Sequence, residues 1–278
     1  MKIAAKKASL PRPISAQGFK PVAYFCGIVL LATATMMAFP MLADLYFGNE
    51  DWKAFAFAGV LTFIPGMSLV YFTKGSLKAG LSLRQAFLLT PLSWLAVSIF
   101  SAIPFYLSEY GIVAGSLADS FFEAVSGITT TGATVISGLD AAPPGMLLWR
   151  ALLQWMGGIG IIATAIAILP ALGIGGMQLF RTESSDRSEK AMPRVRQIAA
   201  TLGKTYIGLT VLAVLVYWAA GMRLFDAIGH AMTSIATGGY STSDASFGHW
   251  QDNGIQWFAT LFMLSGTIPF VLYVRFIA

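Results

Sequence analysis

The sequence has little charge and almost no cysteine. Of its 278 residues, 11% are charged and 56% are hydrophobic, whereas a soluble domain carries about 25% charged residues. This composition excludes a soluble globular protein and a disordered chain. Cys26 is the one cysteine and lies in an apolar run, which excludes a disulfide framework and a cysteine metal cluster. The net charge of +5 comes from basic residues in short loops between apolar runs, so it does not indicate nucleic-acid binding.

Long apolar runs are abundant, and they predict an all-α polytopic membrane protein. Each is close to the roughly 20 residues that cross the hydrocarbon core of a bilayer. Two shorter runs, 117–128 and 224–235, each end in a Thr/Gly-rich stretch. We expect them to be re-entrant half-helices, which a membrane tolerates only where protein or a water-filled cavity surrounds them. The long runs cover residues 22–43, 54–73, 85–107, 146–170, 199–220 and 255–277.

The distribution of Lys and Arg predicts the orientation. With a cytoplasmic N-terminus and only the long runs crossing, 15 of the 18 basic residues lie on the cytoplasmic side. Such a bias is typical of the cytoplasmic loops of membrane proteins. The bias requires that 117–128 and 224–235 do not cross, so it supports the re-entrant interpretation independently of their length. The polar first twenty residues are expected to be a retained tail rather than a cleaved signal peptide.

The chain contains an internal repeat. Residues 117–132 align without a gap on residues 224–239 at a shift of 107, with identities at Leu, Asp, Ala, Ile, Thr and Gly positions. The long runs that follow correspond at a shift of 108, which pairs Gly158 with Gly266. The expected unit is therefore a long span, a half-helix, a Thr/Gly strand and a second long span.

The chemistry that this unit favours is coordination of a monovalent cation. A dehydrated ion needs several oxygen ligands, commonly backbone carbonyls of an extended filter strand. Glycine permits the backbone angles that turn carbonyls toward an ion, and the negative C-terminal end of a half-helix favours a cation. Asp119 and Asp226 lie at the opposite ends, where carboxylates cap helices. The expected filter residues are Thr129, Thr130, Thr131, Gly132 and Ala133 in the first unit, and Ala236, Thr237, Gly238, Gly239 and Tyr240 in the second.

The alternative to a filter is that these Gly/Thr stretches only pack helices together, as is common in membranes. Further residues have supporting roles in the prediction. Glu123 is interpreted either as an ion ligand or as an acid that bonds to the backbone behind the filter, and His230 aligns with it. Gly158 begins a stretch that matches part of a dinucleotide fingerprint, but it lies inside an apolar span, so close helix packing is expected. Arg150 is expected to reach the outer interface or to pair with an outer acid such as Asp140.

Four stretches of the chain carry a family resemblance: 121–134 (FFEAVSGITTTGAT), 148–160 (LWRALLQWMGGIG), 175–183 (GGMQLFRTE) and 236–242 (ATGGYST). Together they resemble the TrkH-type subunits of the Trk/Ktr/HKT potassium transporter superfamily, from about residue 20 onward. The resemblance implies a bacterial inner-membrane protein that transports K⁺, is not an enzyme and needs no cofactor. It also implies four repeats around one pore, after two additional N-terminal helices.

The resemblance divides the chain into a cytoplasmic tail (1–20), a helix pair (21–80), a first repeat with the start of a cytoplasmic loop (81–182) and a second, truncated repeat (183–278). We therefore expect the N-terminal half of a K⁺-translocating subunit. Two alternatives stay open, namely an inactive fragment and a half-subunit that needs a partner chain. A remote alternative is an integral-membrane enzyme, although the long spans carry no His, Asp or Glu for catalysis.

The expected partners follow from the same interpretation. They are the lipid bilayer, and either a second copy in a homodimer or the missing half of the subunit. Family members also bind a cytosolic nucleotide-binding regulatory subunit, so the resemblance implies that residues 181–196 are a docking loop. The other interpretation of this loop is a solvated connector. No nucleic acid is expected.

Overall fold

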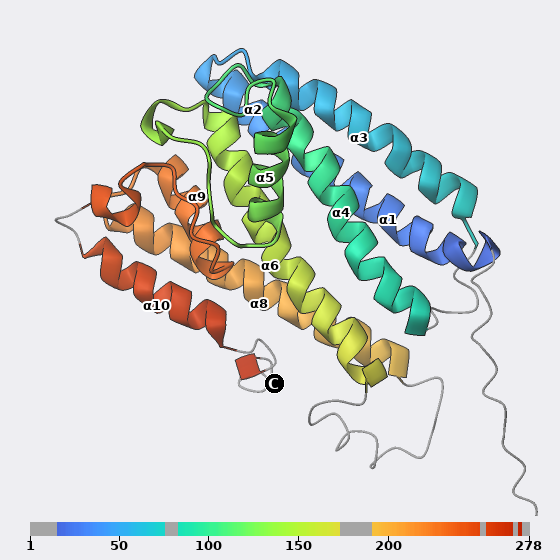
Figure 1. Ribbon diagram of the computed structural model, residues 1–278. Coiled ribbons are helices and arrows are strands. Elements are labelled where there is room, and N and C mark those ends of the chain that lie inside the picture. Colours follow the sequence, from blue (N-terminus) through green and yellow to red (C-terminus); the bar gives the residue numbers. More distant parts are fainter. Residues whose placement is uncertain (1–15, 76–82, 173–190, 251–253, 269–271, 274–278) are drawn as a thin grey trace, which may run out of the picture.

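The structure, a computed structural model, describes residues 16–75, 83–172, 191–250, 254–268 and 272–273. Within these ranges the chain is helical and contains no strand, as Figure 1 shows. The prediction of an all-α protein is confirmed for this part of the chain.

The first predicted span is a single helix with a kink. It consists of α1 (Ala16–Met36) and α2 (Ala38–Phe47), separated by one residue. Pro40 lies just after the break, and because proline has no N–H and its ring crowds the carbonyl four residues earlier, it bends the helix. Gly48 then ends α2 in the left-handed conformation, with φ of 72°.

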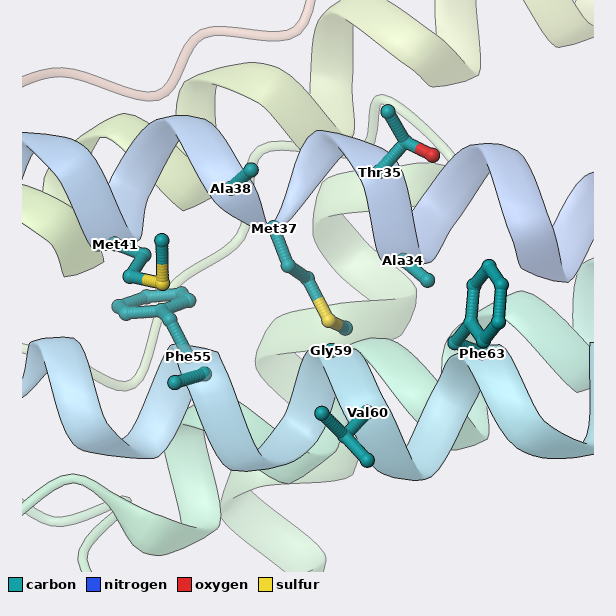
Figure 2. A pocket seen from close by; sticks show the side chains of 10 residues that line it. Ala34, Thr35, Met37, Ala38, Met41, Phe55, Gly59, Val60 and Phe63 are labelled. Carbon is teal, nitrogen blue, oxygen red and sulfur yellow. The ribbon is translucent and has the colours of Figure 1, made fainter.

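A pocket of about 280 Å³ lies at this kink, between α1–α2 and α3 (Trp52–Thr73). Figure 2 shows it lined by small and apolar side chains, among them Ala34, Ala38 and Gly59. The hydroxyl of Thr35 already donates to the Leu31 carbonyl at 2.8 Å, so the wall of the pocket presents apolar surface.

Four helical stretches in the described residues are long and apolar enough to cross a membrane, which indicates a multi-pass membrane protein. Their exposed side chains are largely hydrophobic, as expected for surfaces that face lipid. Figure 1 shows α3 and α4 (Leu83–Leu107) beside α1, with which both are in contact. The four stretches are Gly18–Phe47, Trp52–Thr73, Arg84–Leu107 and Ala200–Ala219.

The two short runs form helices with the predicted bounds, α5 (Leu117–Ile128) and α9 (Leu224–Ile235). Each has 12 residues, or about 18 Å at 1.5 Å per residue, which is too short to cross a bilayer. Two single-turn 3₁₀ helices, Leu139–Ala141 and Ser246–His249, follow the segments that leave α5 and α9.

The long helix α6 (Pro144–Leu172) lies between the two halves of the structure. It contacts α5 on one side and α9 and α8 (Ala191–Ala219) on the other (Figure 1). One hydrophobic core surrounds Trp149 of α6, and a second surrounds Tyr217 of α8. Side chains of α6 can therefore reach the segments that follow both short helices.

The prediction of one continuous span over 255–277 is wrong. The helix α10 (Ile255–Thr267) ends after 13 residues, and Ile268 is extended, with φ of −67° and ψ of 129°. Residue 269 is proline, which disfavours the helical conformation of the residue before it.

Candidate ion-coordination site

Two segments carry the predicted filter residues, and we call residues 129–136 the first segment and residues 236–243 the second segment. Both leave their helices by the same turn. In the first segment, the amides of Thr130 and Thr131 donate to carbonyls three and five residues earlier, at 3.0 and 2.9 Å. Thr237 and Gly238 repeat this pattern at 3.1 and 2.9 Å. The bonds are those of a Schellman helix end, and they agree residue for residue at the shift of 107.

The left-handed residues of the two turns also correspond. Thr130 has φ of 57° and Thr237 has φ of 52°, and glycines follow two residues later with φ of 78° at Gly132 and 85° at Gly239. Positive φ is an outlier for a β-branched residue and costs roughly 1–2 kcal/mol. Backbone strain of this kind clusters at functional sites, and here it occurs at equivalent positions of both units.

The first and second segments are in direct contact. A Cβ atom placed on Gly132 would lie 2.0 Å from the carbonyl oxygen of Gly238, so no side chain fits between the two strands. On its other side, Gly238 faces Gln154 of α6, whose amide carbon would lie 2.3 Å from a Cβ atom at Gly238. Both glycines are therefore required by close approach, and at Gly132 the positive φ adds to this requirement.

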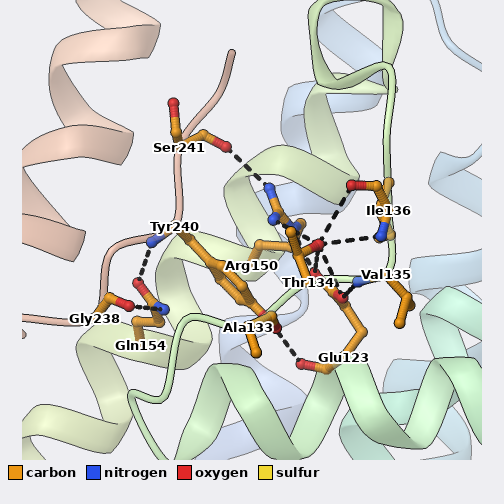
Figure 3. Close-up of polar contacts among 10 residues, drawn as sticks. All are labelled: Glu123, Ala133, Thr134, Val135, Ile136, Arg150, Gln154, Gly238, Tyr240 and Ser241. Atoms are coloured by element: carbon orange, nitrogen blue, oxygen red, sulfur yellow. Dashed lines mark hydrogen bonds and ion pairs between the residues drawn. The ribbon is translucent and has the colours of Figure 1, made fainter. Parts of the chain in front are cut away.

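Gln154 holds the second segment at two points (Figure 3). Its Nε2 donates to the carbonyl of Gly238 at 2.8 Å, and its Oε1 accepts from the amide of Tyr240 at 3.0 Å. The residue is fully buried. Gln154 is not among the residues predicted from the sequence, although a neutral polar side chain inside the apolar run 146–170 was a signal for it.

Arg150 and Glu123 form a buried ion pair, with 2.8 Å between Nε and Oε1. The expectation that Arg150 reaches the interface or pairs with Asp140 is wrong. Arg150 is 1% exposed, because its helix packs on α5 and turns the guanidinium inward. Its Nη1 donates to the carbonyl of Ser241 at 2.9 Å, and its Nη2 donates to the hydroxyl of Thr134 at 3.1 Å. A buried charge requires such complete pairing.

Glu123 is turned toward the backbone of the first segment. Its carboxylate accepts from the amide of Val135 at 3.1 Å and from the hydroxyl of Thr134 at 2.9 Å. Tyr240 completes the network from the second segment, because its hydroxyl lies 3.0 Å from the carbonyl of Glu123 and 3.2 Å from that of Ala133. Its ring lies 4.1 Å from the Arg150 guanidinium carbon, so the network joins both segments (Figure 3).

The second unit has a neutral group at the position of Glu123. His230 Nδ1 lies 2.8 Å from the carbonyl of Asp226, and Nε2 lies 3.0 Å from the hydroxyl of Ser241. Since a carbonyl only accepts, Nδ1 donates, and Nε2 of the neutral ring accepts from Ser241. The rings of Phe247 and Trp250 lie 4.8 and 5.0 Å from the imidazole. His230 therefore supports the segment, and the described residues contain no group of three potential metal-ligating His, Cys, Asp or Glu side chains.

The two aspartates lie in the first turns of their helices. Asp119 Oδ2 accepts from the hydroxyl of Ser116 at 2.5 Å, and that hydroxyl oxygen accepts from the Asp119 amide at 3.3 Å. Asp226 pairs with Arg223 at 2.8 Å and accepts from the hydroxyl of Thr242 at 2.7 Å. Negative charge at a helix N-terminus is stabilising. The expectation that these carboxylates cap the helices is wrong, because the N-cap of α5 is Ser116 and the N-cap of α9, Arg223, makes no side-chain cap bond.

Two of the ten predicted filter carbonyls lie within hydrogen-bond distance of protein donors. The single proton of the Tyr240 hydroxyl is shared between the carbonyls of Ala133 at 3.2 Å and Glu123 at 3.0 Å, and the carbonyl of Gly238 accepts from Gln154. A carbonyl oxygen has two lone pairs, so a protein donor on one of them does not test whether the oxygen faces an ion, and the assignment of Ala133 and Gly238 to the filter stays a prediction. In the described part of the chain, no hydrogen bond reaches the carbonyls of the other eight residues, namely Thr129, Thr130, Thr131, Gly132, Ala236, Thr237, Gly239 and Tyr240.

The predicted pairing of Gly158 with Gly266 is wrong by one residue. A Cβ atom on Gly157 would lie 2.0 Å from the carbonyl of Ile128, and one on Gly266 would lie 2.6 Å from that of Ile235. Gly157 and Gly266 are therefore the equivalent residues, since each lies against the carbonyl of the last residue of a short helix. The pairing shifts because the connection to α10 is two residues longer than the connection to α6. Gly158 instead faces α8 and the second segment, with the Tyr206 hydroxyl 2.5 Å from a Cβ at this position.

Comparisons with known proteins agree on one family. The family model described as TrkH, a cation transport protein, matches residues 52–278. The chain is 42% identical over 258 residues to the Trk system potassium uptake protein TrkI of Halomonas elongata, covering 92% of this chain and 52% of that protein. It is 39% identical over 248 residues to the Trk system potassium uptake protein TrkH of Escherichia coli K12, covering 88% and 51%.

A solved structure agrees with the sequence relatives. The potassium transporter TrkH from Vibrio parahaemolyticus matches with a TM-score of 0.77 and 35% identity, over 89% of this chain and 49% of that chain. The chain thus spans about half the length of the curated relatives that it matches.

Proposed function

The chain belongs to the TrkH family of cation transport proteins, and from this premise we propose that it supplies two of the strands that line a K⁺-selective pore. The observation that carries the proposal is the repeated turn, in which left-handed Thr130 and Gly132 correspond to left-handed Thr237 and Gly239. The relatives are named as potassium uptake proteins, which supports K⁺ as the transported ion and argues against an enzyme.

In this proposal K⁺ loses its hydration water at the two segments, and backbone carbonyls replace it. The ligands come from the eight carbonyls that accept no hydrogen bond from the described residues, four in each segment. Both short helices end where their segment begins, so their negative C-terminal ends are directed toward the ion path and favour a cation. Glu123, Arg150 and His230 stay behind the segments and keep them in place.

The membrane arrangement is part of the proposal. α5 and α9 enter the membrane from outside without crossing it, the N-terminal tail is cytoplasmic, and the chain lies in the bacterial inner membrane. The positive-inside bias of the sequence supports this orientation. The division into a tail, a helix pair and two repeats belongs to the same proposal.

A pore made of four strands requires two more than this chain supplies. We propose that a second copy in a homodimer or a further half of the subunit provides them. A cytosolic nucleotide-binding subunit is proposed as a regulator, docking at residues 181–196. The part of this loop before residue 191 lies outside the described residues.

The test is growth at limiting K⁺ of bacteria that lack their own K⁺ uptake. The cells express either residues 1–278 or residues 1–278 fused to the part of Halomonas elongata TrkI beyond the match, and membrane insertion is measured in both. Growth with the fusion supports the proposed function, and growth with the chain alone shows that copies of it complete the pore. A membrane-inserted fusion that gives neither growth nor ⁸⁶Rb⁺ uptake would overturn the proposal.

A further inference from the structure

We propose that Gln154 determines which carbonyls of the second segment face the ion, and that it is therefore a specificity-determining positioning residue. The inference rests on the proposed function, because it concerns the selectivity of the same pore. Gln154 belongs to α6, the helix that follows the first segment, yet it holds the second segment. One unit thus sets the strand geometry of the other.

We call the two hydrogen bonds from the Gln154 amide to the second segment the Gln154 clamp. One end donates to the Gly238 carbonyl, and the other accepts from the Tyr240 amide, so the bonds fix the chain on either side of Gly239. Glutamate lacks the donor, and methionine of similar length lacks both groups. Since the site is fully buried, water does not replace a lost partner, and an unpaired buried polar group is costly.

Gln154 also explains a sequence difference between the units. The first segment has Thr131 where the second has Gly238. Gly238 is not among the positive-φ residues, so its backbone conformation accommodates a side chain. A Cβ atom there would lie 2.3 Å from the Gln154 amide carbon. The glycine is therefore present because Gln154 fills the space, and the two residues form a coupled pair.

The clamp is a property of α6 and not of the repeat as such. Gly157 of α6 and Gly266 of α10 contact equivalent carbonyls, and this register places Met263 where α6 has Gln154. Methionine offers no amide to a neighbouring strand. Gln154 therefore makes the second segment different from the first, because the carbonyl of Gly238 accepts a hydrogen bond from a side chain of α6.

The experiment measures K⁺, Rb⁺ and Na⁺ uptake by the TrkI fusion carrying Gln154→Glu or Gln154→Met. We expect the ratio of K⁺ to Na⁺ uptake to fall about tenfold, which corresponds to about 1.4 kcal/mol of differential binding. A lower amount of folded protein would reduce all three rates together and leave the ratio unchanged. An unchanged ratio in membrane-inserted variants of a K⁺-selective fusion would overturn the inference and leave the proposed function standing.

Thr210→Val is the matched control. The Thr210 hydroxyl bonds to Trp155, the neighbour of Gln154 on α6, at 3.0 Å and is buried. This hydroxyl has no bond to either segment, so the control should keep the wild-type ion ratio. A control that shifts the ratio as far as the Gln154 variants would show that any buried bond on α6 has this effect and would overturn the inference.

A second measurement tests the clamp geometry without transport. In the purified chain, Gly238→Ala should lower the thermal midpoint, because the new Cβ meets the Gln154 amide. In the double variant with Gln154→Ala the cost should be smaller than the sum of the two single changes, since contacting residues are not additive. Additive effects would overturn the coupling of Gln154 with Gly238. A wild-type fusion that inserts but transports nothing would refute the proposed function, and the specificity role with it.

Discussion

The turns that open the first and second segments have the same backbone conformation, but the polar side chains behind the two segments differ. Thr130 and Thr237 have nearly the same positive φ, and the turn bonds agree residue for residue. A charged pair, Glu123 and Arg150, lies behind the first segment, and its arginine also reaches the second. The second segment is held in addition by His230 and Gln154. The backbone geometry of the strands is therefore the repeated feature, while the side chains that hold it differ.

The α6 helix is responsible for much of this difference. It supplies both Arg150 and Gln154, while the register set by Gly157 and Gly266 places Ala259 and Met263 at the matching positions of α10. Substitutions that remove the charged pair, or that change equivalent residues in both segments, test this difference.

Removing the arginine should have the largest effect. Arg150→Met leaves the carboxylate of Glu123 buried without its cation, which costs about 3–5 kcal/mol. We expect a large fall in the unfolding free energy of the purified chain in denaturant. Glu123→Gln combined with Arg150→Met should recover part of the loss, because no lone charge then remains. A double variant as unstable as Arg150→Met would contradict the charged support.

Substitution by alanine should destabilise the chain more at Gly132 than at Gly239. Gly132→Ala adds strain at positive φ and a clash with the Gly238 carbonyl, so we expect a loss of about 3 kcal/mol. A Cβ atom at Gly239 would have no neighbouring atom within 4 Å. Gly239→Ala should therefore lower the unfolding free energy by only about 1–2 kcal/mol, the cost of its positive φ. Thermal unfolding of the two variants side by side measures the difference. Equal losses would mean that the two segments are not in contact as described.

Substitution by glycine should change the unfolding free energy equally at Thr130 and Thr237. Thr130→Gly and Thr237→Gly each remove the strain of a β-branched residue at positive φ, so each should raise the unfolding free energy, by up to about 1 kcal/mol. The greater entropy of glycine in the unfolded chain reduces the gain. Denaturant unfolding checks both variants, and a gain at only one position would show that the turns are not equivalent.

The smallest effects are expected at the helix starts. Ser116→Ala removes the N-cap of α5 and should cost about 1 kcal/mol. Arg223→Ala removes an ion pair whose arginine is 86% exposed, and it should cost less than about 0.5 kcal/mol. Thermal midpoints of the two variants test this order, and a larger loss for Arg223→Ala would reverse it.

The sequence was sufficient to predict the bounds of the two short helices, which depend on local patterns. The bounds of α5 and α9 agree with the prediction because each short apolar run has an aspartate in its first turn and ends in a Thr/Gly stretch. The kink at Pro40 and the end of α10 before residue 269 also have local causes. The predicted spans overlooked both, because average hydrophobicity does not register a proline.

Features that depend on packing were not predictable in this way. The inward direction of Arg150 and the clamp by Gln154 depend on which face of α6 meets α5 and α9. The pairing of Gly157 with Gly266 depends on the different lengths of two connections. Nor does the sequence indicate that the carbonyls of Ala133 and Gly238 have protein donors, because that depends on contacts between segments about a hundred residues apart.

The most direct test of the central claim is the ion selectivity of the TrkI fusion carrying Gly132→Val or Gly239→Val. Both glycines lie in the segments that we propose to hold K⁺, and a β-branched residue at positive φ would turn the neighbouring carbonyls. We expect both variants to lose K⁺ over Na⁺ discrimination in uptake measurements, relative to the unsubstituted fusion. Unchanged discrimination in membrane-inserted variants would contradict the assignment of these segments to the ion path.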